Sequence, residues 1–94
     1  MIEEKDILTI KNPLLSYSYC FLYNETANIA EHEKIIIDSK NIMCCYDFAF
    51  YIKNSNKQKL FDAVLASGDL YWIELFYNQI HFDKTKYETL MLFI

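Results

Sequence analysis

Three polar residues, each placed where a predicted helix begins, divide this chain at nearly equal intervals. Asn12, Asn41 and Asp69 are separated by 29 and 28 residues. The nine residues that end at Asn12 (EKDILTIKN) also match the nine that end at Asn41 (EKIIIDSKN) at five positions. Asn and Asp are favoured at helix N-caps because their side-chain oxygens accept hydrogen bonds from the free amides of the first turn. A period near 28 residues lies within the range of helical repeat proteins. The sequence therefore predicts successive segments at 12–40, 41–68 and 69–94.

Apolar residues within these segments recur at the i, i+3, i+4, i+7 spacing of amphipathic helices. The first halves of the second and third segments show it in Cys45, Phe48, Ala49 and Ile52, and in Ile73, Phe76, Tyr77 and Ile80. The second halves show it in His32, Ile35 and Ile36, in Leu60, Ala63 and Val64, and in Tyr87, Leu90, Met91 and Ile94. We expect an all-α, solenoid-like array, in which a lone N-terminal helix in 1–11 precedes three antiparallel helix pairs. Each helix is expected to span ten to twelve residues.

Turn residues and size agree with this architecture. The chain holds one Gly and one Pro, and so few turn residues disfavour an all-β fold. Pro13 follows the N-cap Asn12, at the first helical position, where its missing N–H costs nothing. Gly68 stands just past a predicted helix end, where a left-handed conformation is favoured. Residues 1–94 are expected to form a single domain, because a chain of this length has no room for a second core.

The charge pattern separates classes of partner. All nine basic residues are Lys, and the net charge is −4. Arg is the side chain best suited to bidentate phosphate and base contacts, so we expect no direct binding of nucleic acid. An acidic protein is better suited to a partner with a basic surface.

The expected location is the cytoplasm. No apolar run approaches the roughly 18 residues that a membrane-spanning helix needs. The N-terminal MIEEKDILTIK has no long apolar core and is not typical of a signal peptide. An odd number of cysteines, two of them adjacent (Cys20, Cys44 and Cys45), does not suggest a disulfide framework.

Residues 41–80 resemble short two-helix repeats found in uncharacterised bacterial and phage proteins. The resemblance rests on a Tyr-x-Phe-Ala pattern, a Leu-led helix and a closing Ser-Gly-Asp: Tyr46, Phe48, Ala49, Leu60, Val64, Leu65, Ser67, Gly68 and Asp69. Residues 12–40 match more loosely, because Tyr19 and Cys20 replace Phe-Ala. In the third segment Glu74 replaces the Tyr and Tyr77 the Ala. The resemblance implies a scaffold and carries no catalytic residues.

No group of residues in the sequence has the spacing of a catalytic, cofactor-binding or metal site. A nucleophilic Cys44 or Cys45 needs a neighbouring base, and no spacing ties His32 or His81 to either. Adjacent helical residues point about 100° apart, so the cysteine pair makes a poor metal site, and two buried apolar thiols are the simpler interpretation. His32 is expected in the core with one nitrogen hydrogen-bonded, and Asp83 as the N-cap of the last helix. A cysteine-dependent enzyme remains an alternative.

Aromatic residues suggest a binding surface. Tyr17 and Phe21 are i, i+4 neighbours, and Tyr46 and Phe50 repeat that spacing one segment later. With Tyr71 and Trp72 of the third segment, these six residues are predicted to form an aromatic ridge along one side of the array. Tyr and Trp are frequent anchors of protein interfaces. The competing interpretation places the same rings in the core.

The chain ends in an apolar run that suggests a contact between copies. A terminal repeat normally presents a polar outer face, whereas this end is apolar all round: Leu90, Met91, Leu92, Phe93 and Ile94. A two-fold homodimer through the C-terminal helix is one way to bury it. Packing of the end against its own array is the other.

These observations favour a non-enzymatic helical-repeat module that binds another protein. Its size and acidity are analogous to those of small phage or mobile-element inhibitors of host defence, including anti-CRISPR proteins, which act by steric blocking. The alternative is a nucleic-acid mimic that occupies a basic groove through its carboxylates: Glu25, Glu31, Glu33, Asp38, Asp69, Glu74, Asp83 and Glu88.

Overall fold

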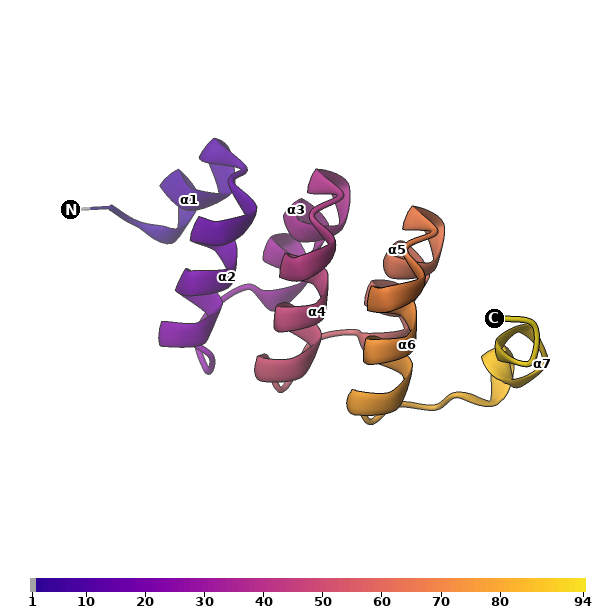
Figure 1. Ribbon diagram of the computed structural model, residues 1–94. Coiled ribbons are helices and arrows are strands. Elements are labelled where there is room, and N and C mark those ends of the chain that lie inside the picture. Colours follow the sequence, from indigo (N-terminus) through magenta and orange to yellow (C-terminus); the bar gives the residue numbers. More distant parts are fainter. Residues whose placement is uncertain (1) are drawn as a thin grey trace.

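The computed structural model describes residues 2–94, and this part of the chain is entirely helical, without a β-strand. The elements are α1 (Glu4–Ile10), α2 (Pro13–Leu22), α3 (Ile29–Ser39), α4 (Ile42–Tyr51), α5 (Lys57–Ser67), α6 (Leu70–Gln79), the 3-10 helix η1 (Thr85–Tyr87) and α7 (Glu88–Met91). The helices lie side by side along one direction (Figure 1), and the molecule measures 49 × 22 × 16 Å.

Tight turns join each odd-numbered helix to the next even-numbered one. The residue after α1, α3 and α5 is left-handed: Lys11 and Lys40 have φ 59°, and Gly68 has φ 73°. This conformation reverses the chain within two residues and favours glycine, which has no Cβ to clash. Gly68 therefore occupies the predicted helix end, while two lysines adopt the same conformation without that freedom.

The three predicted N-caps are confirmed. Asn12 accepts hydrogen bonds from the amides of Leu14 and Leu15, Asn41 from that of Cys44, and Asp69 from those of Tyr71 and Trp72. Two of the turns also share a serine hydroxyl that donates to the carbonyl three residues earlier and accepts from the N-cap amide. These serines are Ser39 and Ser67. The recurring Ser-x-Asn/Asp of the sequence is thus a hydrogen-bonded turn.

The helices expected to pair do pack against each other. Helix α2 contacts α3, and α4 contacts α5. The helices joined by the tight turns, α1–α2, α3–α4 and α5–α6, form three successive columns in Figure 1. The N-terminal helix, expected to be alone, contacts both α2 and α3.

The expected length of the last helix was wrong. In place of ten to twelve residues, the C-terminal segment forms the three-residue η1 and the four-residue α7. Asp83 accepts a hydrogen bond from the Thr85 amide at 3.1 Å, so it begins this short helical turn much as predicted. Of the predicted apolar stripe only Tyr87 is buried, whereas Leu90 and Ile94 are exposed. With so little apolar surface buried, tertiary packing supports only this short helix.

The core runs through the middle of the array and follows the predicted periodicity. In α4 the stripe of Cys45, Phe48 and Ala49 is buried, and Ile52 follows it just past the helix end. The equivalent positions Ile73, Phe76 and Ile80 are also buried, while Tyr77 is partly exposed. Toward the C-terminal end of the core the packing becomes aromatic around Phe61, whose ring centroid lies 4.7–5.9 Å from four others: Phe76, Tyr77, Phe82 and Tyr87.

Candidate functional site

The aromatic ridge predicted from the sequence lies on the three even-numbered helices. Tyr17 and Phe21 belong to α2, Tyr46 and Phe50 to α4, and Tyr71 and Trp72 to α6. The residues divide between the two interpretations of the sequence. Phe21, Phe50 and Tyr71 are 49–67% exposed, whereas the other three pack partly against the core. The ridge is therefore anchored in the fold and still presents rings to solvent.

Ring contacts connect α2 to α4. The ring centroids of Tyr17 and Phe21 lie 6.1 Å apart on α2, and Phe21 meets Tyr51 of α4 edge-on at 6.1 Å. Tyr51 in turn lies 4.8 Å from Phe50. Tyr51 is 54% exposed and was not among the predicted residues. The residue one period earlier is Leu22 and the one a period later is Gln79, so no repeated aromatic pattern pointed to it.

The same network continues from α4 to α6. Phe50 lies 5.8 Å from Tyr46, Tyr46 lies 5.6 Å from Trp72, and Trp72 meets Tyr71 edge-on at 5.4 Å. Each such pair adds about 0.5–1.5 kcal/mol beyond the burial of its surface. The six predicted residues and Tyr51 thus form one connected set of rings across three helices. Rings held in this way lose little freedom when a partner covers them.

An acidic side chain lies within this set of rings. Asp47 of α4 is partly buried, and burial raises the pKa of its carboxyl group above the usual range. Burial also raises the pKa of the Tyr17 and Tyr46 phenols, and the negative charge of Asp47 raises both further. The carboxylate is thus close enough to act on phenols from two different helices. No ion pair to Asp47 is present within residues 2–94.

A serine, a histidine and a glutamate form the most ordered polar contact in the interior. The Nδ1 atom of His32 lies 3.0 Å from Ser16 Oγ, and its Nε2 atom lies 2.9 Å from Glu4 Oε2. An ionised carboxylate only accepts hydrogen bonds, so Nε2 carries a proton and the Ser16 hydroxyl donates to Nδ1. The prediction of a core histidine is confirmed, with both nitrogens bonded rather than one.

This arrangement has the components of a serine nucleophile with its base, but not the access. Ser16 and His32 are both fully buried, and a nucleophile must reach its substrate. The same Glu4 oxygen also accepts the backbone N–H of Asn28 at 2.7 Å. The three side chains therefore tie α1, α2 and the start of α3 together.

The thiols are placed unfavourably for nucleophilic chemistry. All three cysteines are free and buried. Burial raises the pKa of the Cys20 thiol to about 12 and that of Cys45 to about 11, and it raises the pKa of Cys44 as well. A reactive thiol requires the opposite shift. Among the described residues, no group of three or more His, Cys, Asp or Glu side chains is arranged to hold a metal ion.

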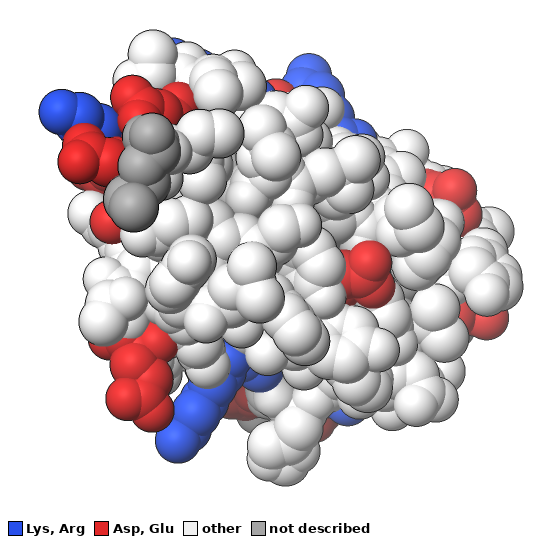
Figure 2. Space-filling view, turned by 90° about the vertical axis from the view of Figure 1, so that its left-hand side faces the viewer, with Lys and Arg blue, Asp and Glu red and all other residues white. Residues whose placement is uncertain are grey.

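The two ends of the array expose apolar surface. At the C-terminal end Leu92 and Phe93 are more than 80% exposed, Leu90 and Ile94 are exposed to a lesser extent, and Met91 packs partly on the core. At the N-terminal end uncharged atoms cover most of the surface, and charged groups lie mainly at its margin (Figure 2). A shallow groove of about 490 Å³ lies there, lined by Ile2, Ile7, Leu15, Tyr19, Leu22 and Tyr23 among others.

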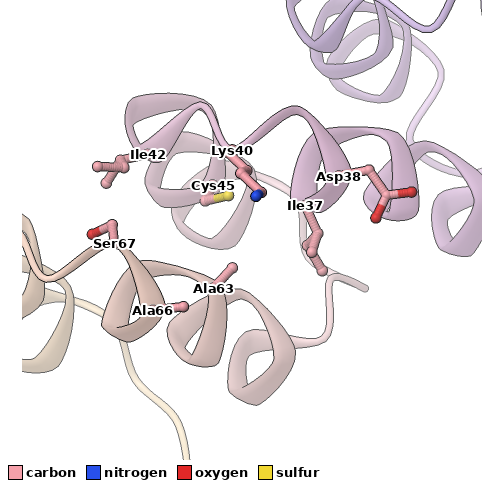
Figure 3. A pocket seen from close by; sticks show the side chains of 8 residues that line it. All are labelled: Ile37, Asp38, Lys40, Ile42, Cys45, Ala63, Ala66 and Ser67. Atoms are coloured by element: carbon pink, nitrogen blue, oxygen red, sulfur yellow. The ribbon is translucent and has the colours of Figure 1, made fainter.

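A third groove, of about 470 Å³, lies beside the tight turn between α3 and α4. Ala63, Ala66 and Ser67 of α5 form one side of it, and Ile37 and Ile42 form the other (Figure 3). Its charged residues are Asp38 and Lys40, and Asp38 lies at one edge of the group (Figure 3). These groups do not converge on a common point, so the groove suggests no chemistry.

The eight carboxylates considered for a nucleic-acid mimic do not all reach the surface. Glu33 is only 6% exposed and accepts the backbone N–H of Asn56 at 2.5 Å. The others are distributed over loops and helices of both sets. Helices long and apolar enough to cross a bilayer do not occur in residues 2–94.

Comparisons with protein families, with curated proteins and with solved structures found no match to this chain.

Proposed function

We propose that this chain is a non-enzymatic helical-repeat module that binds another protein through the face formed by α2, α4 and α6. The observation that carries the proposal is the connected set of aromatic rings on these three helices, from Tyr17 to Tyr71. Buried thiols and a buried Ser16 hydroxyl leave the known nucleophile types without access to substrate. A surface that blocks or scaffolds a partner sterically is the function best suited to these features.

The repeat character is part of the proposal. It is supported by contacts that recur at the sequence period. Glu4 accepts the amide of Asn28, the N-cap of α3, and Glu33, 29 residues later, accepts the amide of Asn56, the N-cap of α5. Phe61 occupies the next equivalent position and packs against Phe82 and Tyr87 instead. In a repeat array each unit contacts its neighbours in this way.

The setting proposed for this module is that of a small phage or mobile-element inhibitor of a host defence complex. The chain has 94 residues and a net charge of −4, the size and acidity of anti-CRISPR-like inhibitors that act by occupying a surface of their target. The cytoplasm is the proposed location, because such targets act there.

Removing exposed rings from the ridge is expected to abolish capture of the partner. Tagged wild type should retain a partner from a lysate of the host, and the Tyr46→Ala/Phe50→Ala variant should retain at least tenfold less, because aromatic anchors are often worth 2 kcal/mol or more. Phe21→Ala/Phe50→Ala gives a milder variant, since both rings are about half exposed. Circular dichroism checks that each variant is folded.

The control removes a similar amount of exposed apolar surface elsewhere. Ile2→Ala/Ile10→Ala changes two exposed residues outside the ridge and should leave capture unchanged. Identical sets of retained proteins for the wild type and both folded ridge variants would contradict the proposed binding face.

We also propose a homodimer through the C-terminal residues Leu90, Met91, Leu92, Phe93 and Ile94. Leu92 and Phe93 expose the largest fractions of their side chains at this end, and burial in a two-fold contact removes them from water. Light scattering coupled to size exclusion should give about twice the chain mass of 11.3 kDa. Leu92→Ser/Phe93→Ser should give a monomer. A monomeric wild type at all concentrations, or an unchanged dimer in the variant, would rule out this contact.

A further inference from the structure

The ridge face differs from the rest of the molecule in the sign of its charges. Helices α2, α4 and α6 contain no lysine, and their only charged residues are Asp47 and Glu74. All nine lysines lie on the odd-numbered helices, in the turns and loops, or in the C-terminal segment. Glu74 stands one period after Tyr46, at the position where the ridge passes onto α6. The face therefore combines exposed aromatic rings with negative charge alone.

Asp47 is an expensive residue at this position for the fold. Its partial burial disfavours the charged carboxylate, and burial is the only influence that shifts its pKa. Within residues 2–94 it has neither an ion pair nor a hydrogen bond to offset that cost. Asparagine, which is uncharged and similar in shape, would avoid the cost. A carboxylate that weakens the fold in this way is typical of a binding site, where the partner supplies the missing charge.

The chain itself shows what completes such a site. At the C-terminal end the Lys86 Nζ atom lies 5.4 Å from the centroid of the Tyr87 ring and 3.9 Å from Asp62 Oδ2. Tyr87 also donates a hydrogen bond from its hydroxyl to Asp62 at 2.6 Å. An ammonium group, an aromatic ring and a carboxylate thus occur together there. The ridge has the ring and the carboxylate, and its helices have no ammonium group.

We infer that the ridge recognises a lysine or arginine side chain of its partner, which stacks on the rings beside Asp47 and places its charge against that carboxylate. This inference rests on the proposed function and adds the chemistry of the partner. Cations are attracted to the faces of Trp, Tyr and Phe rings, and Arg and Lys also cover apolar surface with their stems. Asp47 lies between Tyr17 of α2 and Tyr46 of α4, because its charge acts on both phenols.

The test uses two capped peptides of the same length, one with two lysines among alanines and one with glutamines in their place. An arginine version forms a third arm. Trp72 is the one tryptophan of the chain and belongs to the ridge, so its fluorescence reports occupancy directly. We expect saturable changes with the lysine or arginine peptide and at least tenfold weaker binding of the glutamine peptide.

Two matched variants separate the site from the overall charge. Asp47→Asn should weaken binding of the basic peptide about tenfold, the effect of losing a charge-assisted hydrogen bond. Asp38→Asn, an exposed residue of α3, makes the same change in net charge and should alter binding less than twofold. Since the pKa of Asp47 is raised by burial, Asp47→Asn should keep or raise the melting temperature, so that lost binding does not reflect lost folding.

Each other outcome decides against the inference. Equal binding of the basic and glutamine peptides, no saturable change at millimolar basic peptide, or equal affinities of wild type and Asp47→Asn would each overturn it. Partner capture then separates the two proposals. If the Tyr46→Ala/Phe50→Ala variant loses the partner and Asp47→Asn keeps it, the ridge binds protein without a cationic group. If neither variant loses the partner, the proposed function fails as well.

Discussion

Replacing His32 with alanine is expected to lower the free energy of unfolding by about 3–5 kcal/mol. The ring is fully buried, so its removal leaves a cavity. The Ser16 hydroxyl loses its acceptor and Glu4 loses a donor, and each unpaired buried polar group adds a further cost. Urea denaturation followed by circular dichroism measures the change, with the slope of the transition checked for two-state behaviour.

The repeat provides a control for this substitution. The residues one period after Ser16 and His32 are Cys45 and Leu60, both buried. Replacing both members of a hydrogen-bonded pair with apolar groups of similar shape costs much less than removing one. Ser16→Cys/His32→Leu should therefore recover at least half of the stability that His32→Ala loses. A double variant no more stable than His32→Ala would show that Glu4, rather than the pair, depends on the imidazole.

Local signals carried most of what the sequence predicted correctly. The N-caps at Asn12, Asn41 and Asp69 depend on bonds to amides two or three residues away. The left-handed turn at Gly68 depends on the residue itself. Lys11 and Lys40 adopt the same turn without any local preference for it. Their conformation was predictable only because the aligned segments placed them at the position of Gly68.

Long-range contacts account for what the sequence did not provide. Glu33 meets Asn56 across 23 residues, and His32 meets Glu4 across 28. No spacing rule connects such pairs before the helices have been packed. The short C-terminal helix has the same origin, since its apolar stripe matched the helical period but has no neighbouring helix along most of its length to cover it.

The ridge lies between these two cases. The i, i+4 spacing of Tyr17 with Phe21 and of Tyr46 with Phe50 identified which residues share a helix face. It did not identify Asp47, because that residue gains its environment from the approach of α2 to α4. A single carboxylate between apolar residues has no pattern in one sequence. Its place among the rings emerges only from the packed structure.

Glu33→Ala is expected to cost about 1–3 kcal/mol of unfolding free energy at neutral pH. Glu33 is nearly buried, and its carboxylate accepts the amide of Asn56, which is the N-cap of α5. Without that acceptor, the amide loses its partner and α3 loses its hydrogen bond to the start of α5. Glu33→Gln retains an acceptor oxygen at the same place and should cost much less. An alanine variant as stable as the glutamine variant would show that water replaces the carboxylate without cost.

The same pair of variants separates the hydrogen bond from the charge. Burial raises the pKa of Glu33 above its usual 4.5, although the Asn56 amide and the charges of Lys59 and Lys57 lower it in part. A carboxyl group whose pKa is raised on folding contributes stability that is present below pH 4.5 and lost as the pH rises through the folded-state pKa. The wild type should therefore lose unfolding free energy as the pH rises from 4.5 toward neutrality.

Glu33→Gln removes this contribution, so its stability should fall less over the same pH range. Part of the fall should remain, because burial also raises the pKa of Asp47. Glu31→Gln is the matched control: it lies on the same helix, is exposed, and changes the net charge equally. Urea titrations at several pH values measure all three proteins. If Glu31→Gln flattens the profile as much as Glu33→Gln does, the net charge of −4, rather than the buried carboxylate, governs the pH dependence.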